Sequence, residues 1–299
     1  MRTAFIKQLA KEAKYNDKIF LIVGDLGFNV VEEFATTFPE RFLNAGVAEQ
    51  NMAGVASGLA IEGYNVYIYS IGNFPTLRCM EQIRYDIAYH NLNVKIIAVG
   101  GGYAYGTLGA SHHATEELGM LRTIPNMTVC APGDPIETEA IVRWTANYNG
   151  PVYLRLGKAG EPIVHKEKIN SLQNGDILLI KKGTSTAIIS TGAMLSYAHD
   201  FIINNKINVS LYSCPYVKPI NKIQLKDIAD NYKEIITIEE HQASGGFGSA
   251  ILEAYSDLYQ NNEISFFPNI KRIAIQDQFF NVSGSQEYLR NLSELTINN

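Results

Sequence analysis

The chain alternates short apolar runs, typical of buried β-strands, with longer segments that have helical spacing. The apolar runs of the first half cover residues 19–27, 65–70, 94–102, 127–132 and 151–156. Continuous apolar strands separated by helices predict a parallel sheet that is covered on both faces. Ligands of such sheets bind at the carboxyl ends of the strands. The loops at those ends are residues 24–28, 69–76, 100–113 and 156–162.

Helical segments are predicted between these strands, and a second α/β series follows them. The predicted helices include residues 48–63, 76–91, 115–124 and 134–148, the last opening with Asp134 as N-cap and Pro135 at the first helical position. The pattern weakens over residues 157–179 and resumes from about residue 186. We therefore expect an α/β protein of two doubly wound domains, 1–160 and 181–299, joined by a linker at 161–180.

Composition excludes several classes of protein. The 299 residues are 46% hydrophobic and 18% charged, which favours large cores over disorder. A net charge of −5 gives no general attraction to nucleic acid or anionic membrane. No apolar window is long enough for a membrane span, and the amphipathic N-terminus lacks a signal-peptide core. Three widely spaced cysteines indicate a reducing compartment, so we expect a cytoplasmic protein.

Glu49 is a single carboxylate within a run of small and apolar residues, "FLNAGVAEQNMAGVASGLA" at 42–60. Acidic side chains are seldom buried without a partner. One interpretation is a carboxylate stabilised by the free N–H groups of a helix N-terminus. The other is a buried acid that hydrogen-bonds the ring nitrogen of a heteroaromatic ligand, with small neighbours leaving room for a ligand or a second chain.

Two loops carry further candidate side chains. In "YSIGNFPTLR" (69–78), Phe74 and Tyr69 form either a flat platform for a ring or ordinary core, and Arg78 is either a site residue or an ion-paired helix residue. The segment 100–117 contains several glycines followed by His112 and His113. Histidine suits proton transfer near neutral pH, whereas adjacent histidines without a spaced third ligand do not predict zinc. Surface histidines are the alternative.

Two later segments have competing interpretations. Arg155 and Lys158 are interpreted as part of a strand-end loop, where two cations suit a phosphate or carboxylate, or form a solvated charge pair. The segment "EEHQASGGFGSA" (239–250) is too irregular for a dinucleotide fingerprint. It predicts a tight strand-to-helix turn, with a phosphate cradle as the lesser alternative.

Taken in order, these segments resemble one enzyme family. They are "GDLG", "FLNAGVAEQNMAGVASGLA", "EQIRYDIAYHNLNV", "GASHHATEELGMLRTIPNMTVCAPGDPIE", "GPVYLRLGK" and "EEHQASGGFGSA". The combination is similar to the C-terminal half of transketolase and of 1-deoxyxylulose-5-phosphate synthase, over nearly the whole chain. The resemblance implies a thiamine-diphosphate pyrimidine-binding domain followed by a transketolase C-terminal domain.

The resemblance also implies a partner. The family binds the cofactor diphosphate and a divalent metal through a Gly-Asp-Gly motif, and this sequence contains no such motif. The chain therefore resembles the smaller subunit of a split transketolase, with a partner subunit that holds the diphosphate and Mg²⁺ or Ca²⁺, expected as α2β2. The activity implied is transfer of a two-carbon ketol unit from a ketose to an aldose. The substrates implied are sugars or sugar phosphates.

The resemblance assigns roles to eight residues. Glu49 corresponds to the family glutamate that hydrogen-bonds N1′ of the aminopyrimidine and promotes loss of the thiazolium C2 proton. Phe74 corresponds approximately to the ring stacked on the aminopyrimidine, and Tyr69 is a second wall. Catalytic roles are implied for Glu49 and His112. Cofactor contacts are implied for Glu49, Phe74, Tyr69 and Asp25, and substrate contacts for His112, His113, Lys158, Arg78 and Asp25, with no metal ligand on this chain.

Three departures from the family pattern point away from ordinary pentose phosphates. Leu108 replaces an aspartate that contacts a substrate hydroxyl, and a histidine that helps bind substrate phosphate is missing near Gly100. Lys158 stands where the family commonly has arginine, and a lysine supplies charge without a bidentate fork. A modified sugar substrate is one hypothesis. The β subunit of a 2-oxo acid or acetoin dehydrogenase, or a non-catalytic homologue that binds a partner, are the alternatives.

Overall fold

Seven strands form the first sheet of the computed structural model, which describes residues 1–297 and so omits the last two positions of the predicted second domain. The strand order is β10-β5-β6-β4-β3-β1-β2, and every neighbouring pair is parallel except β10 with β5. The strands are β1 (Ile19–Val23), β2 (Phe42–Asn44), β3 (Asn65–Ile71), β4 (Val94–Val99), β5 (Thr128–Cys130), β6 (Val152–Leu156) and β10 (Tyr216–Lys218).

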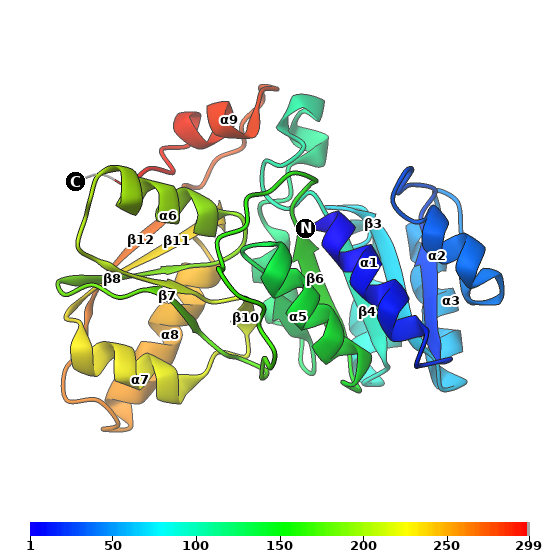
Figure 1. Cartoon of the computed structure of the whole chain (residues 1–299), viewed down its shortest axis with the longest axis horizontal. Coiled ribbons are helices and arrows are strands. Elements are labelled where there is room, and N and C mark those ends of the chain that lie inside the picture. The colour runs from blue at the N-terminus through cyan, green and yellow to red at the C-terminus, as the bar shows by residue number, and fades with distance from the viewer. Residues whose placement is uncertain (298–299) are drawn as a thin grey trace.

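Helices cover both faces of this sheet, as a parallel sheet requires. On one face α1 (Arg2–Ala13) and α5 (Pro135–Ala146) pack against each other and share an apolar core with β1 and β6 (Figure 1). On the other face lie α3 (Glu49–Ile61), the π-helix η3 (Gln82–Tyr89) and α4 (Glu117–Arg122). Short elements complete this half, namely α2 (Glu32–Thr37), η1 (Pro39–Arg41), η2 (Leu77–Cys79), η4 (Gly106–Leu108) and η5 (Ala110–His112).

The second sheet has the order β12-β11-β8-β9-β7, with only β7 antiparallel to its neighbour. Its strands are β7 (Leu178–Lys181), β8 (Thr186–Ser190), β9 (Ser210–Ser213), β11 (Glu234–Gln242) and β12 (Asn269–Ile275). Helices α7 (Lys222–Asn231) and α8 (Phe247–Gln260) contribute to the core that continues onto the α3 face of the first sheet. Helices α6 (Met194–Asn204) and α9 (Gln286–Leu292) pack in a separate core. The predicted α/β class with two doubly wound domains is confirmed.

The structure differs from the sequence pattern at three places. The helix predicted over 76–91 divides into a short 3₁₀ turn and a π-helix. Strand β7 begins inside the segment predicted as linker. It is a partly buried edge strand, antiparallel to β9, although residues 177–180 form a short apolar run. Strand β10 comes from the second half of the chain and pairs with β5 of the first sheet. The pairing of a strand from one domain with the sheet of the other depends on tertiary packing. The sequence around β10 therefore contains no pattern that predicts its partner.

The predicted N-cap of the helix that begins at Pro135 is confirmed. Asp134 caps α5, because its Oδ1 accepts a hydrogen bond from the backbone N–H of Glu137 at 2.8 Å. The three cysteines are buried free thiols. Among the described residues, no helix combines the length and apolar character that crossing a bilayer requires.

A buried arginine joins the two domains. Arg155 is 6% exposed, and its Nε lies 2.9 Å from Oε1 of Glu117, which is fully buried. Its Nη2 donates to the carbonyl oxygens of Ala114 and, at 2.9 Å, of Glu240 in the second domain. Both interpretations of Arg155 from the sequence, an anion-binding cation and a solvated charge, are therefore wrong. The side chain is structural because β6 carries it beneath the domain junction.

We predict that Arg155→Ala lowers the free energy of unfolding by about 3–5 kcal/mol, because it leaves the buried Glu117 carboxylate without its cation. The measurement is the shift of the urea midpoint followed by circular dichroism. Arg84→Ala is the control, since Arg84 forms an exposed pair with Glu81 and such pairs contribute about 0–1 kcal/mol. Equal midpoints for the two variants would contradict the role assigned to Arg155.

Candidate functional site

Glu49 is a buried carboxylate with weak internal partners. It is the first residue of α3 and is 4% exposed. Ser70 Oγ donates to its Oε1 at 3.5 Å, and Arg78 Nη1 lies 3.4 Å from its Oε2. Both distances are long for hydrogen bonds. The carboxylate also lines a cavity of about 440 Å³, together with Val47, Ala48, Gln50, Asn51 and Arg78.

Arg78, Phe74 and His112 continue from Glu49 as a connected group. The guanidinium carbon of Arg78 lies 4.2 Å from the centroid of the Phe74 ring. The His112 ring meets Phe74 edge-on, with centroids 5.3 Å apart, and its Nδ1 is 3.0 Å from Ser111 Oγ. We call Glu49, Arg78, Phe74 and His112 the Glu49 cluster. Sequence reasoning predicted all four as site residues, and the structure brings them together.

Two loops at the carboxyl end of the sheet create this cluster. The loop after β3 bends at Gly72, whose φ of 39° is in the left-handed region. A Cβ on Gly72 would lie 3.2 Å from the Cβ of Ala114, so glycine allows the two loops to approach closely. Asn73 Nδ2 then donates to the carbonyl oxygen of His113 at 2.6 Å. The loop that carries Phe74 is thereby tied to the loop that carries both histidines.

Asp25 lies in the turn after β1, next to a glycine that is close to Glu49. It follows Gly24, on which a Cβ would be 3.7 Å from Glu49 Oε1. The Asp25 side chain is exposed, and its Oδ1 accepts from Asn44 Nδ2 at 2.9 Å. Asn44 Oδ1 in turn accepts from the backbone N–H of Asp25 at 3.0 Å. This reciprocal pair holds the turn after β1 against the end of β2.

Tyr69 lies outside the cluster, which corrects its assignment as a second wall of the cofactor site. Successive side chains of a strand point to opposite faces of the sheet. Ser70 points toward Glu49, so the neighbouring Tyr69 points to the α1 face, where it is 1% exposed. Its ring stacks on Phe5 with centroids 5.9 Å apart. Tyr69 is therefore a core residue, as the alternative interpretation of the aromatic loop proposed.

Within residues 1–297, His113 and Lys158 do not bond to Glu49. His113 is 6% exposed, packs edge-on against Tyr103 at 5.1 Å, and burial lowers its pKa. Its Nε2 has no hydrogen-bond partner among the described residues. Lys158 is exposed just beyond β6, two strands from β3 in the sheet order. Among the described residues, neither of these side chains forms a hydrogen bond or ion pair with Glu49.

Leu108 and Gly100, the two positions of the glycine-rich loop that depart from the family pattern, have different surroundings. Leu108 is 55% exposed at the end of η4. Gly100 has φ +92°, and a Cβ there would lie 2.2 Å from Cδ2 of Tyr105. The Tyr105 ring thus occupies the space into which a larger side chain at residue 100 would project. Restoring a histidine at this position requires Tyr105 to move.

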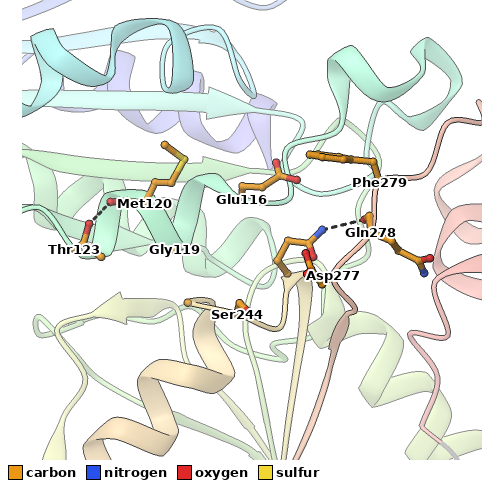
Figure 2. A pocket seen from close by; sticks show the side chains of 10 residues that line it. Glu116, Gly119, Met120, Thr123, Ser244, Asp277, Gln278 and Phe279 are labelled. Carbon is orange, nitrogen blue, oxygen red and sulfur yellow. Dashed lines mark hydrogen bonds between the residues drawn. The ribbon is translucent and has the colours of Figure 1, made fainter.

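A larger cavity of about 550 Å³ lies at the domain junction (Figure 2). Met120 and Glu116 border one side, Gln278 and Phe279 another, and Ser244 lies below. None of the eight residues with predicted roles lines it. Behind Gly119, the buried His241 accepts the Gly119 N–H at its Nε2, at 3.2 Å. Burial, followed by the charge of Arg155, lowers the pKa of His241 to about 4.

Asp134, Glu137 and His165 are a further group that sequence reasoning did not single out. One ligand atom from each lies within 4.8 Å of the others. Asp134 Oδ2 already accepts the backbone N–H groups of Val164 and His165 at 3.0 Å and faces His165 Nδ1 at 3.1 Å. The group therefore anchors the connecting segment to α5. The sequence pattern did not predict this group, because His165 is distant from Asp134 in the chain and meets it only in the folded protein.

Comparison with known protein families identifies both halves of the chain. Residues 1–160 match the model of the transketolase pyrimidine-binding domain, and residues 175–294 match the transketolase C-terminal domain. A subunit of the apulose-4-phosphate transketolase of Phocaeicola vulgatus is 32% identical over 260 residues, which cover 86% of this chain and 83% of that protein. The 1-deoxy-D-xylulose-5-phosphate synthase of Clostridium perfringens SM101 is 28% identical, over 93% of this chain but 44% of that enzyme.

A solved structure supports the same relationship. It is described as a split-gene transketolase in an inactive β4 tetramer, and it is 34% identical to this chain. The TM-score is 0.85, and the match covers 99% of this chain and 93% of that one.

The buried His241 predicts a pH-dependent stability. Its pKa of about 4 in the folded state lies below the ordinary value of 6.5, so the folded protein binds fewer protons. The stability it contributes is complete above pH 6.5 and is lost as pH falls through 4, by about 3 kcal/mol. We expect the stability difference between wild type and His241→Gln to change by about that amount between pH 7 and pH 4. Other titratable groups are common to both proteins, so a constant difference in urea titrations would contradict this prediction.

Proposed function

Because the chain belongs to the transketolase family, we propose that it is the pyrimidine-binding subunit of a split transketolase that transfers a two-carbon ketol unit. The observation that carries the proposal is Glu49, a buried carboxylate with only long internal contacts beside a cavity. The family matches over both halves support the enzyme class. The relatives named as a transketolase subunit and as a split-gene transketolase support a two-chain enzyme.

The residues of the Glu49 cluster fit the aminopyrimidine of thiamine diphosphate. A buried, under-partnered carboxylate accommodates a ring nitrogen that shares a proton with it. When bound, the cofactor supplies the means to stabilise the carbanion of the transferred unit. Glu49 would hold the proton at N1′, and Phe74 would offer a ring face for stacking. His112 would exchange a proton with a substrate hydroxyl, while Asp25 and Lys158 would contact the substrate from the rim.

The partner subunit would hold the diphosphate and Mg²⁺ or Ca²⁺, in an α2β2 assembly in the cytoplasm. The exposed face of α3 beside the cavity supports a contact there. A Cβ on Gly54 or Gly58 would meet nothing within 4 Å, and Ile61 and Val47 expose 69% and 71% of their area. Large exposed apolar side chains next to open glycines suit close packing of another chain.

The substrate we propose is a sugar phosphate other than the ordinary pentose phosphates. Two observations support this: Leu108 presents an apolar side chain where the family pattern has an aspartate, and Tyr105 fills the space beside Gly100. The relative from Phocaeicola vulgatus is named for apulose-4-phosphate, which makes that sugar phosphate a first candidate to assay. Full activity of the reconstituted enzyme on common pentose phosphates would argue against the proposal.

We predict that Glu49→Gln lowers ketol transfer by the reconstituted two-subunit enzyme by about 10²–10⁴-fold, the usual range for a positioned proton-transfer group. Glutamine keeps the size of the side chain but cannot exchange the proton. Glu62→Gln is the control, because Glu62 is exposed at the other end of the same helix and should retain full activity. Retained activity in Glu49→Gln would exclude the proposed role.

We also predict that Gly54→Leu prevents assembly with the partner while leaving this subunit folded. Leucine raises helix propensity over glycine, so α3 itself is not weakened. The measurement is the mass of the mixture by light scattering, with circular dichroism of the lone variant. Gln260→Leu, at the exposed end of α8, is the control and should assemble normally. Normal assembly of Gly54→Leu would place the partner elsewhere.

A further inference from the structure

Arg78 contacts the same two groups that the proposed cofactor site needs. Its guanidinium carbon lies 4.2 Å from the centroid of the Phe74 ring, and its Nη1 lies 3.4 Å from Glu49 Oε2. The space between the aromatic ring and the carboxylate is therefore occupied by a side chain of the same subunit. Arg78 also lines the cavity beside Glu49.

We propose that Arg78 is an internal placeholder for the aminopyrimidine, which occupies the site in the lone subunit and is displaced when the cofactor binds. The inference rests on the proposed function, because it assumes that Glu49 and Phe74 receive the aminopyrimidine. What is new is a state of the lone subunit in which Arg78, a residue of the same chain, fills the cofactor site.

The chemistry of the two groups explains why one can replace the other. A guanidinium is planar and delocalised, stacks on aromatic faces, and directs N–H donors at carboxylates. An aminopyrimidine is likewise planar and stacks on a ring while its edge faces the carboxylate. The Arg78 guanidinium contacts both the Phe74 ring and the Glu49 carboxylate, the two groups that would receive the aminopyrimidine. Occupation by Arg78 and by the cofactor ring is therefore mutually exclusive.

The energetics favour a placeholder that leaves easily. A buried carboxylate with no partner is costly, so a cation beside Glu49 stabilises the lone subunit. Arg78 itself is 52% exposed, and an ion pair with one exposed member at 3.4 Å is weak. Its displacement should therefore reduce the apparent cofactor affinity only severalfold. The flexible side chain can then turn toward solvent, where the family resemblance implies that Arg78 contacts the substrate.

The test uses the isolated chain and a probe that lacks the diphosphate, 4-amino-2,5-dimethylpyrimidine, so that no partner or metal is needed. We expect Arg78→Ala to bind this probe about three- to tenfold more tightly than wild type, by calorimetry or ligand-observed NMR. Arg84→Ala is the control, because its exposed pair with Glu81 also spans 3.4 Å, and it should leave probe affinity unchanged. Glu49→Gln should lose probe binding with or without Arg78.

Each outcome separates the inference from the proposed function. Equal or weaker binding by Arg78→Ala, or no binding by either protein at millimolar probe, would overturn the placeholder. If that occurs while Glu49→Gln still abolishes activity of the reconstituted enzyme, the proposed function stands without the placeholder. Circular dichroism of Arg78→Ala confirms folding, which the exposure of this side chain leads us to expect.

Discussion

A parallel sheet must be covered by helices on both faces, and this requirement determines the arrangement of the protein. Six strands of the first sheet run parallel, so their carboxyl ends meet at one edge and their connecting helices must pack on the two faces. That edge gathers the loops after β1, β3 and β4. Helix α3 returns from β2 and begins at the same edge, which places Glu49 beside Ser70 of β3. The candidate site is thus a consequence of the sheet topology.

Glu49 is an exception in this arrangement, because it is a buried acid whose hydrogen-bond partners are distant. The chain buries a carboxylate at 4% exposure and offers it only a serine and an arginine at long distances. Two other buried acids have shorter contacts: Glu239 accepts the N–H groups of Phe247 and Gly248, and Oε1 of Glu117 pairs with Arg155 at 2.9 Å. Local violations of otherwise consistent rules are expected at functional sites. The contrast marks Glu49 more strongly than its burial alone.

Particular residues show how far sequence reasoning reached. Glu49, Phe74, Arg78 and His112 were predicted individually, and the loop contact through Gly72 and Asn73 brings them together. Tyr69 was misplaced because its neighbours in the loop suggested an aromatic platform, whereas the alternation of β3 directs it to the opposite face. Arg155 was misread because a strand-end cation suggests an anion site, and only the packing of the two domains reveals its buried partners.

By itself, the sequence determined the α/β class, the two series of strands and helices, the family resemblance and most of the Glu49 cluster. These follow from periodicity and motif order, which are written along the chain. The tertiary structure alone decided the exchange of β10 into the first sheet, the anchoring of the connecting segment by Asp134 and His165, and the stacking of Arg78 on Phe74. Each of these is a contact between distant or oppositely facing residues, whose formation depends on which surfaces the folded sheets bring together.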